Sequence, residues 1–287
     1  MRAHTEIPDN QGSRFTRFAQ ARPLILFFLL AYLWSWTIWL AVPAIAQRIG
    51  INTDLGLFEI AVIVIGACGP TMAAFITRWL GCRDLRIFRV WTGTRPLLAG
   101  LALGFALLFL ATLVAPALAL VQASPHSLHW SALLRWSSYT VNYSTLIGGP
   151  LNEEPGWRGF ALPRLQERFG YVLATMILAL LWTGWHLPLF QIPGWSSASP
   201  AQFFLTLVGI SFLLTAIANF SKFNVLAAVL FHAFFNTSAG LVNVLTQGLP
   251  PRPHAMWNYA LAVFLTGSTL GWIALRSIRA NKANPGC

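Results

Sequence analysis

Long apolar stretches constrain this chain more than any other feature of its sequence. About 20 consecutive apolar residues are needed for a helix to span the hydrocarbon core of a bilayer, and eight stretches of roughly this length can be found among the 287 residues. The fourth is the least apolar, because it contains two glutamates. We therefore expect an all-α fold, a polytopic membrane bundle of about eight transmembrane helices. The stretches are residues 24–46, 57–80, 97–121, 138–160, 171–190, 202–219, 223–246 and 257–275.

The scarcity of charge supports this interpretation. Only 9% of the residues are charged and 56% are hydrophobic, whereas a soluble domain has about 25% charged residues. The composition therefore excludes an ordinary soluble domain. The formal net charge of +11 is spread over many connections rather than gathered in one domain. We expect these cations to contact anionic membrane lipid, and no nucleic-acid partner.

Lys and Arg also predict the orientation, because positive residues favour the cytoplasmic side of a membrane. With eight spans, only Arg48, Arg135 and Arg252 of the 19 Lys and Arg fall on the outer side. Seven spans would scatter the charges over both sides. We expect a multi-pass protein with both termini in the cytoplasm. Its predicted parts are a polar cytoplasmic N-terminal segment (1–22), a single membrane domain (23–278) and a cytoplasmic tail (279–287).

Four ionisable residues stand out, because a polar group inside a membrane is costly and marks a functional site by default. Of the eight acidic residues, only Glu153 and Glu154 lie well inside the apolar stretches and away from their ends. Of the six histidines, only His186 and His232 lie within apolar helices. Two carboxylates and two imidazoles therefore share the hydrophobic region.

The depths of these groups can be compared from their spacing. Gly170 is a plausible break between the fourth and fifth stretches, and Glu154 and His186 each lie 16 residues from it. In an antiparallel hairpin, both would lie about 24 Å from the turn. His232 comes ten residues after Lys222, so it should be somewhat shallower. We expect the three elements to meet in one cavity within the membrane.

Helical spacing supplies partners for these groups, because residues four apart share a helix face. Taken alone, each pair has a structural interpretation: an ion pair, a packing histidine or an interhelical hydrogen bond. Together, at compatible depth, they favour a catalytic site. The pairs are Glu154 with Arg158, Trp182 with His186, and His232 with Asn236.

This set of groups suits amide hydrolysis. A carboxylate beside an imidazole can activate water as a general base, and a second histidine with an asparagine amide can stabilise an oxyanion. Alternatively, Glu153, His186 and His232 could hold a zinc ion that keeps one position open for water. The HExxH helix of common zinc proteases is absent from the sequence, and no Ser or Cys nucleophile stands out.

The motifs resemble those of the CAAX protease and bacteriocin-processing (CPBP, or Abi) family, which is similar to the type II CAAX prenyl endopeptidase. "EEPGWRG" matches the family's EExxxR motif, and its flanks are typical of bacterial members. "WTGWH" matches FxxxH with Trp182 in place of Phe, and "HAFFN" matches HxxxN. The motifs occur in family order over a catalytic core of about residues 140–246. The resemblance implies a protein of the bacterial cytoplasmic membrane.

The resemblance also implies a role for each motif residue. Glu153 would activate the attacking water with His186, and the oxyanion would be stabilised by His232 and Asn236. Glu154 would shape the site together with Arg158, although the comparison of depths slightly favours Glu154 as the base. Family members are described as metalloproteases that use zinc, and a metal-free glutamate mechanism is the alternative.

We therefore predict an intramembrane endopeptidase that cleaves a membrane-associated peptide or protein near the cytoplasmic face, where the charged end of the fourth stretch opens. One alternative is a catalytically inactive membrane scaffold or immunity protein, against which the intact set of motif residues argues. Another is a proton-coupled carrier with a Glu/His relay. The clustering of the polar residues on three stretches argues against a carrier.

Overall fold

The computed structural model describes residues 14–51, 53, 56–82, 93–103, 149–192, 195, 196, 198–245 and 255–283. All regular secondary structure in these residues is helical, which confirms the predicted all-α fold. Five helical segments are long and apolar enough to cross a membrane, and Val225–Asn236 is a shorter apolar helix. Most of the predicted stretch 97–121 and the first part of 138–160 lie outside the described residues. The five long segments are Pro23–Arg48, Gly56–Gly81, Pro150–Gln191, Pro200–Phe220 and Trp257–Ile278.

The N-terminal part of the bundle is built from two apolar segments that pack together. Its helices are α1 (Arg14–Ala21), α2 (Pro23–Trp36), a π-helical turn η1 (Thr37–Ala41), α3 (Val42–Arg48), α4 (Gly56–Ala67) and α5 (Gly69–Cys82). α2 packs along α5, and Ser35 Oγ donates a hydrogen bond to the Gly66 carbonyl at 2.7 Å. Residues 14–21 of the predicted polar N-terminal segment form α1, which packs against α5.

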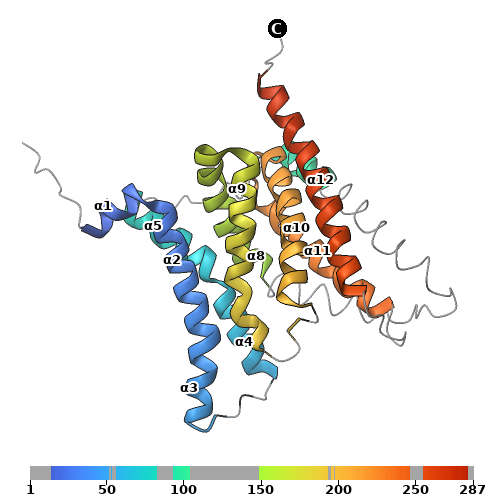
Figure 1. Ribbon diagram of the computed structural model, residues 1–287. Helices are drawn as coiled ribbons and strands as arrows, with labels where there is room; N and C mark the ends of the chain where they lie inside the picture. The colour runs from blue at the N-terminus through green and yellow to red at the C-terminus, as the bar shows by residue number, and fades with distance from the viewer. Residues whose placement is uncertain are drawn as a thin grey trace, which may run out of the picture.

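The central element is a helical hairpin. It consists of α8 (Pro150–Glu154), a π-helical turn η3 (Pro155–Ala161), α9 (Leu162–His186) and a 3₁₀ turn η4 (Leu187–Gln191). A straight helix would separate Glu153 from Trp182 by about 44 Å, yet their side chains are hydrogen-bonded at 2.7 Å. The chain reverses at Gly170, whose φ of 70° and ψ of 177° are essentially restricted to glycine. Figure 1 shows this reversal at the upper end of α9, and it confirms the predicted break.

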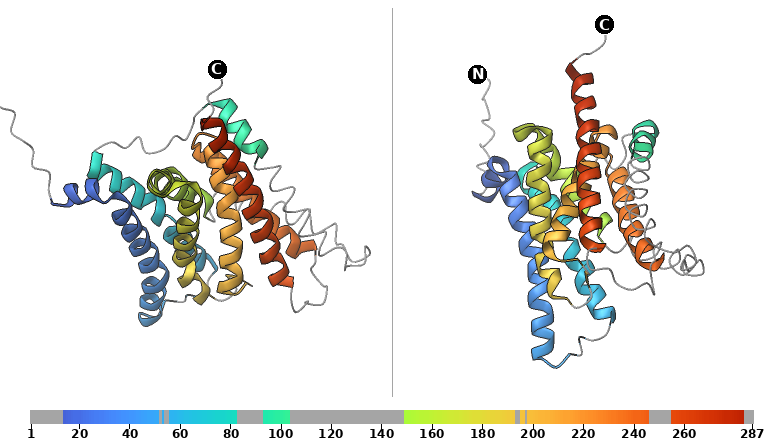
Figure 2. Two further views of the ribbon diagram at one scale, coloured as in Figure 1. Left: turned by 45° about the horizontal axis from the view of Figure 1, so that its top comes forward. Right: turned by 45° about the vertical axis from the view of Figure 1, so that its right-hand side comes forward.

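Three further helices complete the described bundle: α10 (Pro200–Phe220), α11 (Val225–Leu245) and α12 (Ala255–Ala283). α10 begins with a capping box, in which the Ser199 and Gln202 side chains bond each other's backbone N–H groups. α12 packs along α10, and α11 contacts α8. The hairpin therefore lies between α2 and α5 on one side and α10 to α12 on the other (Figures 1 and 2). The main apolar core joins the hairpin to its neighbours and includes Phe27 of α2, Phe160 of η3 and Leu213 of α10.

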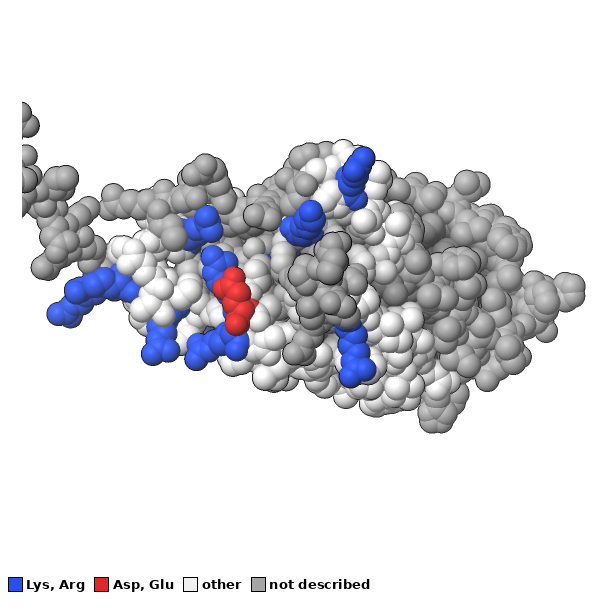
Figure 3. Space-filling view, turned by 90° about the horizontal axis from the view of Figure 1, so that it is seen from above, with Lys and Arg blue, Asp and Glu red and all other residues white. Residues whose placement is uncertain are grey.

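Lys and Arg are distributed around the end of the bundle at which the hairpin turns. Figure 3 shows this end from above: the Lys and Arg side chains lie at many points of the surface, and an acidic patch lies among them. Positive residues favour the cytoplasmic side, and the prediction that the turn at Gly170 faces the cytoplasm stays a prediction.

Candidate active site

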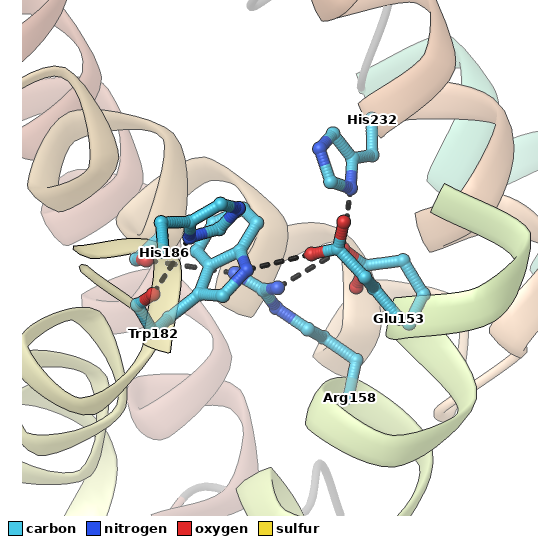
Figure 4. A network of polar contacts seen from close by, with 7 residues as sticks. Glu153, Arg158, Trp182, His186 and His232 are labelled. Atoms are coloured by element: carbon cyan, nitrogen blue, oxygen red, sulfur yellow. Dashed lines mark hydrogen bonds and ion pairs between the residues drawn. The ribbon is translucent and has the colours of Figure 1, made fainter. Parts of the chain in front are cut away.

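Three parts of the chain bring their ionisable residues together in the middle of the bundle (Figure 4). The hairpin supplies the two glutamates and an arginine from α8 and η3, and a tryptophan and a histidine from the last turns of α9. A second histidine comes from α11. All six side chains are buried, none with more than 7% of its surface exposed. We call this set the acid–imidazole cluster. It comprises Glu153, Glu154, Arg158, Trp182, His186 and His232.

Glu154 joins two elements through one oxygen. Its Oε1 accepts a hydrogen bond from Arg158 Nη1 at 3.0 Å and another from His232 Nδ1 at 2.8 Å. Glu154 is 0% exposed and Arg158 is 1% exposed, so the predicted i,i+4 pair is a fully buried ion pair. Glu154 Oε2 is also buried and has no hydrogen-bond partner among the described residues. Glu154 therefore fixes the imidazole of His232 and is closed to solvent.

Glu153 has different surroundings. Its Oε2 accepts a hydrogen bond from Trp182 Nε1 at 2.7 Å, and 4% of the residue remains exposed. The backbone passes closely over this carboxylate at Gly149, the N-cap of α8, whose φ is 130°. A Cβ atom at this position would overlap Glu153 Oε1. The glycine therefore allows both the unusual backbone conformation and the close approach.

His186 has a defined tautomer. Its Nδ1 lies 2.7 Å from the Trp182 carbonyl oxygen, which can only accept, so the proton is on Nδ1 and the neutral ring has its lone pair on Nε2. The ring packs against Trp185 and Phe203 and stacks on Trp195. It makes no hydrogen bond to a carboxylate within the described part of the chain. The residue of α9 that contacts a carboxylate is Trp182, one helical turn before His186.

His232 is oriented by Glu154, to which its Nδ1 donates. The opposite nitrogen, Nε2, is therefore the atom that a substrate or water can meet. Asn236 lies one turn further along α11 and is half-buried. Its side chain has no hydrogen bond to another residue that the structure describes, so the structure leaves it outside the acid–imidazole cluster.

The structure adds one polar neighbour that we had not predicted. Ser211 of α10 is buried and its Oγ accepts a 3.5 Å hydrogen bond from Arg158 Nη2. A serine inside the apolar segment "GISFLL" is the only signal for it in the sequence. It brings a fourth helix into contact with the buried ion pair.

The predicted zinc ligands can be tested against this geometry. Within the described residues, no group of three His, Cys, Asp or Glu is placed to hold a metal ion, and this includes Glu153, His186 and His232. The Nδ1 atoms of both histidines are already hydrogen-bonded. The arrangement as it stands does not fit a zinc site, and zinc binding stays a prediction.

The segment that contains the cluster is similar to proteins of a known family. Residues 135–238 match the model of the type II CAAX prenyl endopeptidase Rce1-like family. A curated relative, CAAX prenyl protease 2 of Methanococcus maripaludis, is 27% identical over 121 residues, which are 39% of this chain and 45% of the relative. The match thus spans less than half the length of that relative. All six residues of the cluster, and Asn236, lie within residues 135–238.

Proposed function

Because residues 135–238 of this multi-pass membrane protein match the model of the type II CAAX prenyl endopeptidase Rce1-like family, we propose that the chain is an intramembrane endopeptidase. It hydrolyses a peptide bond of a membrane-associated peptide or protein near the cytoplasmic face. The observation that carries the proposal is the acid–imidazole cluster, which joins two carboxylates and two imidazoles from separate helical segments. Burial of these groups in an apolar bundle costs free energy, and ionisable groups inside a membrane mark a functional site by default.

Exposure and hydrogen bonding favour Glu153 over Glu154 as the general base. Glu154 is fully buried, and its one bonded oxygen is shared by Arg158 and His232. Glu153 is slightly exposed and has a single neutral donor, Trp182. We therefore assign the base to Glu153 and a supporting role to Glu154, which holds His232 in place.

The reaction then follows from the free atoms of the cluster. Glu153 takes a proton from water, and the hydroxide attacks the scissile carbonyl carbon. The family resemblance implies that His186, whose Nε2 carries a lone pair, acts on the same water. The resulting oxyanion is stabilised by a hydrogen bond from His232 Nε2, which requires a proton on Nε2 in addition to the one that Nδ1 donates to Glu154. The family resemblance implies Asn236, one turn further along the same helix, as a second donor, although its side chain lies outside the acid–imidazole cluster. The proton passes to the amide nitrogen as the C–N bond breaks, which yields an amine and a carboxylic acid.

The surroundings of His186 indicate the kind of substrate. Trp195, Phe203 and Phe190 form an aromatic wall beside its ring, with ring centroids 5.0–5.9 Å apart. Such a wall suits apolar side chains or a lipid group next to the scissile bond. We propose a substrate that is anchored in the membrane. The name of the relative mentions a prenyl group, so the assay below includes a prenylated substrate peptide.

A cleavage assay tests the proposal. The protein, purified in detergent, is expected to cut a membrane-anchored reporter peptide, either prenylated or carrying an apolar helix, faster than the same peptide without an anchor. His186→Ala should lower kcat by about 100-fold, because it removes a proton acceptor beside the water. Met176→Ala, a lipid-exposed change on the same helix, should leave the rate unaltered. If the wild-type protein cuts none of the anchored peptides, the proposal fails.

Metal removal gives a separate test. No group of the described residues is placed to hold a metal ion. We therefore expect a strong chelator to change kcat by no more than about twofold, and the purified protein to hold less than one zinc ion per chain. Metal analysis by mass spectrometry before and after chelation is the measurement. Stoichiometric zinc whose removal abolishes cleavage, and whose return restores it, would contradict this expectation.

A further inference from the structure

Trp182 contacts four of the five ionisable side chains of the cluster. Its indole N–H donates to Glu153 at 2.7 Å, and its carbonyl accepts from His186 at 2.7 Å. The guanidinium of Arg158 lies over the ring, 4.2 Å from its centroid. The His232 ring meets it edge-on, with centroids 5.2 Å apart and planes at 90°. The indole plane is therefore fixed by its neighbours on several sides.

The N–H group distinguishes Trp182 from the other buried indoles nearby. Trp157, Trp182 and Trp185 are all no more than 1% exposed. Within the part of the chain that the structure describes, the N–H groups of Trp157 and Trp185 have no hydrogen-bond partner, whereas that of Trp182 bonds a carboxylate. An indole offers one donor and no acceptor. A ring without an N–H group could fill the same space, so packing does not account for the hydrogen bond between Trp182 and Glu153.

We propose that Trp182 is a positioning residue for Glu153, on the premise of the endopeptidase function. The indole N–H holds Oε2, which stops the carboxylate from rotating about its last torsion, a soft degree of freedom in glutamate. Oε1 is then the oxygen that takes the proton from water. Arg158 and His232 hold the ring in turn, so the orientation of the base depends on the packing of the whole cluster.

Removal of this bond should slow the chemical step. A hydrogen bond to a charged group is worth a factor of roughly 10 to 100 in rate if it is needed only to align the base. We expect kcat to fall by that factor while KM stays within about twofold, because Trp182 holds the base and not the substrate. A purely structural role would instead lower the amount of folded protein and leave the kcat of the folded fraction unaltered.

Two replacements of Trp182 separate the N–H from the ring. Trp182→Phe removes both the donor and part of the ring, whereas benzothienylalanine at this position, introduced by amber suppression, keeps the bicyclic shape and replaces N–H by sulfur. Both should show the loss in kcat. The matched control is Trp157→Phe, which removes a buried indole whose N–H is not hydrogen-bonded to a described residue. If the benzothienyl protein keeps the wild-type kcat, the proposal is wrong.

A spectroscopic measurement decides on the bond whether or not a substrate is cleaved. In a ¹⁵N-labelled sample in micelles, the indole N–H resonance of Trp182, assigned by its loss in Trp182→Phe, should lie downfield and move upfield in Glu153→Ala. An unmoved resonance would overturn the proposal. If the wild-type protein cleaves no peptide but the resonance moves, the positioning of Glu153 stands and the endopeptidase function falls.

Discussion

Replacement of Glu153 by alanine is expected to lower kcat/KM for a membrane-anchored peptide by about 10,000-fold, the upper end of what a general base contributes. Glu153 is the carboxylate of the cluster with a single hydrogen-bond donor, Trp182, and 4% of the residue is exposed, against 0% of Glu154. The measurement is the initial rate of cleavage in detergent. Glu167→Ala is the matched control, because Glu167 lies on the same hairpin and is exposed.

The loss must come from chemistry and not from unfolding. Glu153→Ala leaves the Trp182 N–H without its acceptor, which should cost about 1–3 kcal/mol. Thermal unfolding of the purified variant will show whether the protein is folded at the assay temperature. A folded Glu153→Ala protein that cleaves at the wild-type rate would exclude Glu153 as the base.

Arg158→Ala is expected to destabilise the protein by about 3–5 kcal/mol, the largest effect on stability that we predict. The substitution leaves the Glu154 carboxylate buried, with no guanidinium at 3.0 Å. It also removes the cation over Trp182 and the contact with Ser211. Denaturant unfolding in one detergent measures the change. Arg164→Ala, a partly exposed arginine on the same hairpin, should cost no more than about 1 kcal/mol.

A double substitution distinguishes a buried ion pair from general loss of packing. Glu154→Leu combined with Arg158→Met removes both charges and keeps most of the volume, so stability should recover most of the loss. Catalysis should stay low, because His232 loses the carboxylate that orients its ring. If the double variant is less stable than Arg158→Ala, the buried pair is not the cause of the destabilisation.

Much of the fold could be predicted because hydropathy and glycine act locally. The predicted stretches 24–46, 202–219 and 257–275 agree closely with the apolar helical spans Pro23–Arg48, Pro200–Phe220 and Trp257–Ile278, since helix is the structure that satisfies the backbone of such a segment in lipid. The reversal at Gly170 was predictable because only glycine adopts that backbone conformation easily. The cost of an isolated polar group in lipid led us to expect that the carboxylates and imidazoles lie near one another, and their side chains are close in the structure; their role as a site stays a prediction.

The contacts within the site could not be predicted, because they depend on how each helix is rotated and packed. The i,i+4 spacing predicted the partner of Glu154 on its own helix, Arg158, but gave no sign that His232 of α11 would share the same oxygen. Equal spacing from Gly170 predicted that His186 and Glu154 lie at the same depth, but it could not show that the α9 residue in contact with a carboxylate is Trp182. Spacing along the chain predicts the depth of a side chain to within about one helical turn, whereas its contacts depend on how the helices pack.

Mass spectrometry of a cleavage reaction run in heavy-oxygen water is the most direct test of the central claim, that these buried groups activate water for peptide hydrolysis. The wild-type protein should convert an anchored peptide into two fragments, with one heavy oxygen in the new carboxyl terminus. Folded Glu153→Gln protein should leave the peptide whole. An intact peptide after incubation with wild type, or equal fragment yields from both proteins, would contradict the claim.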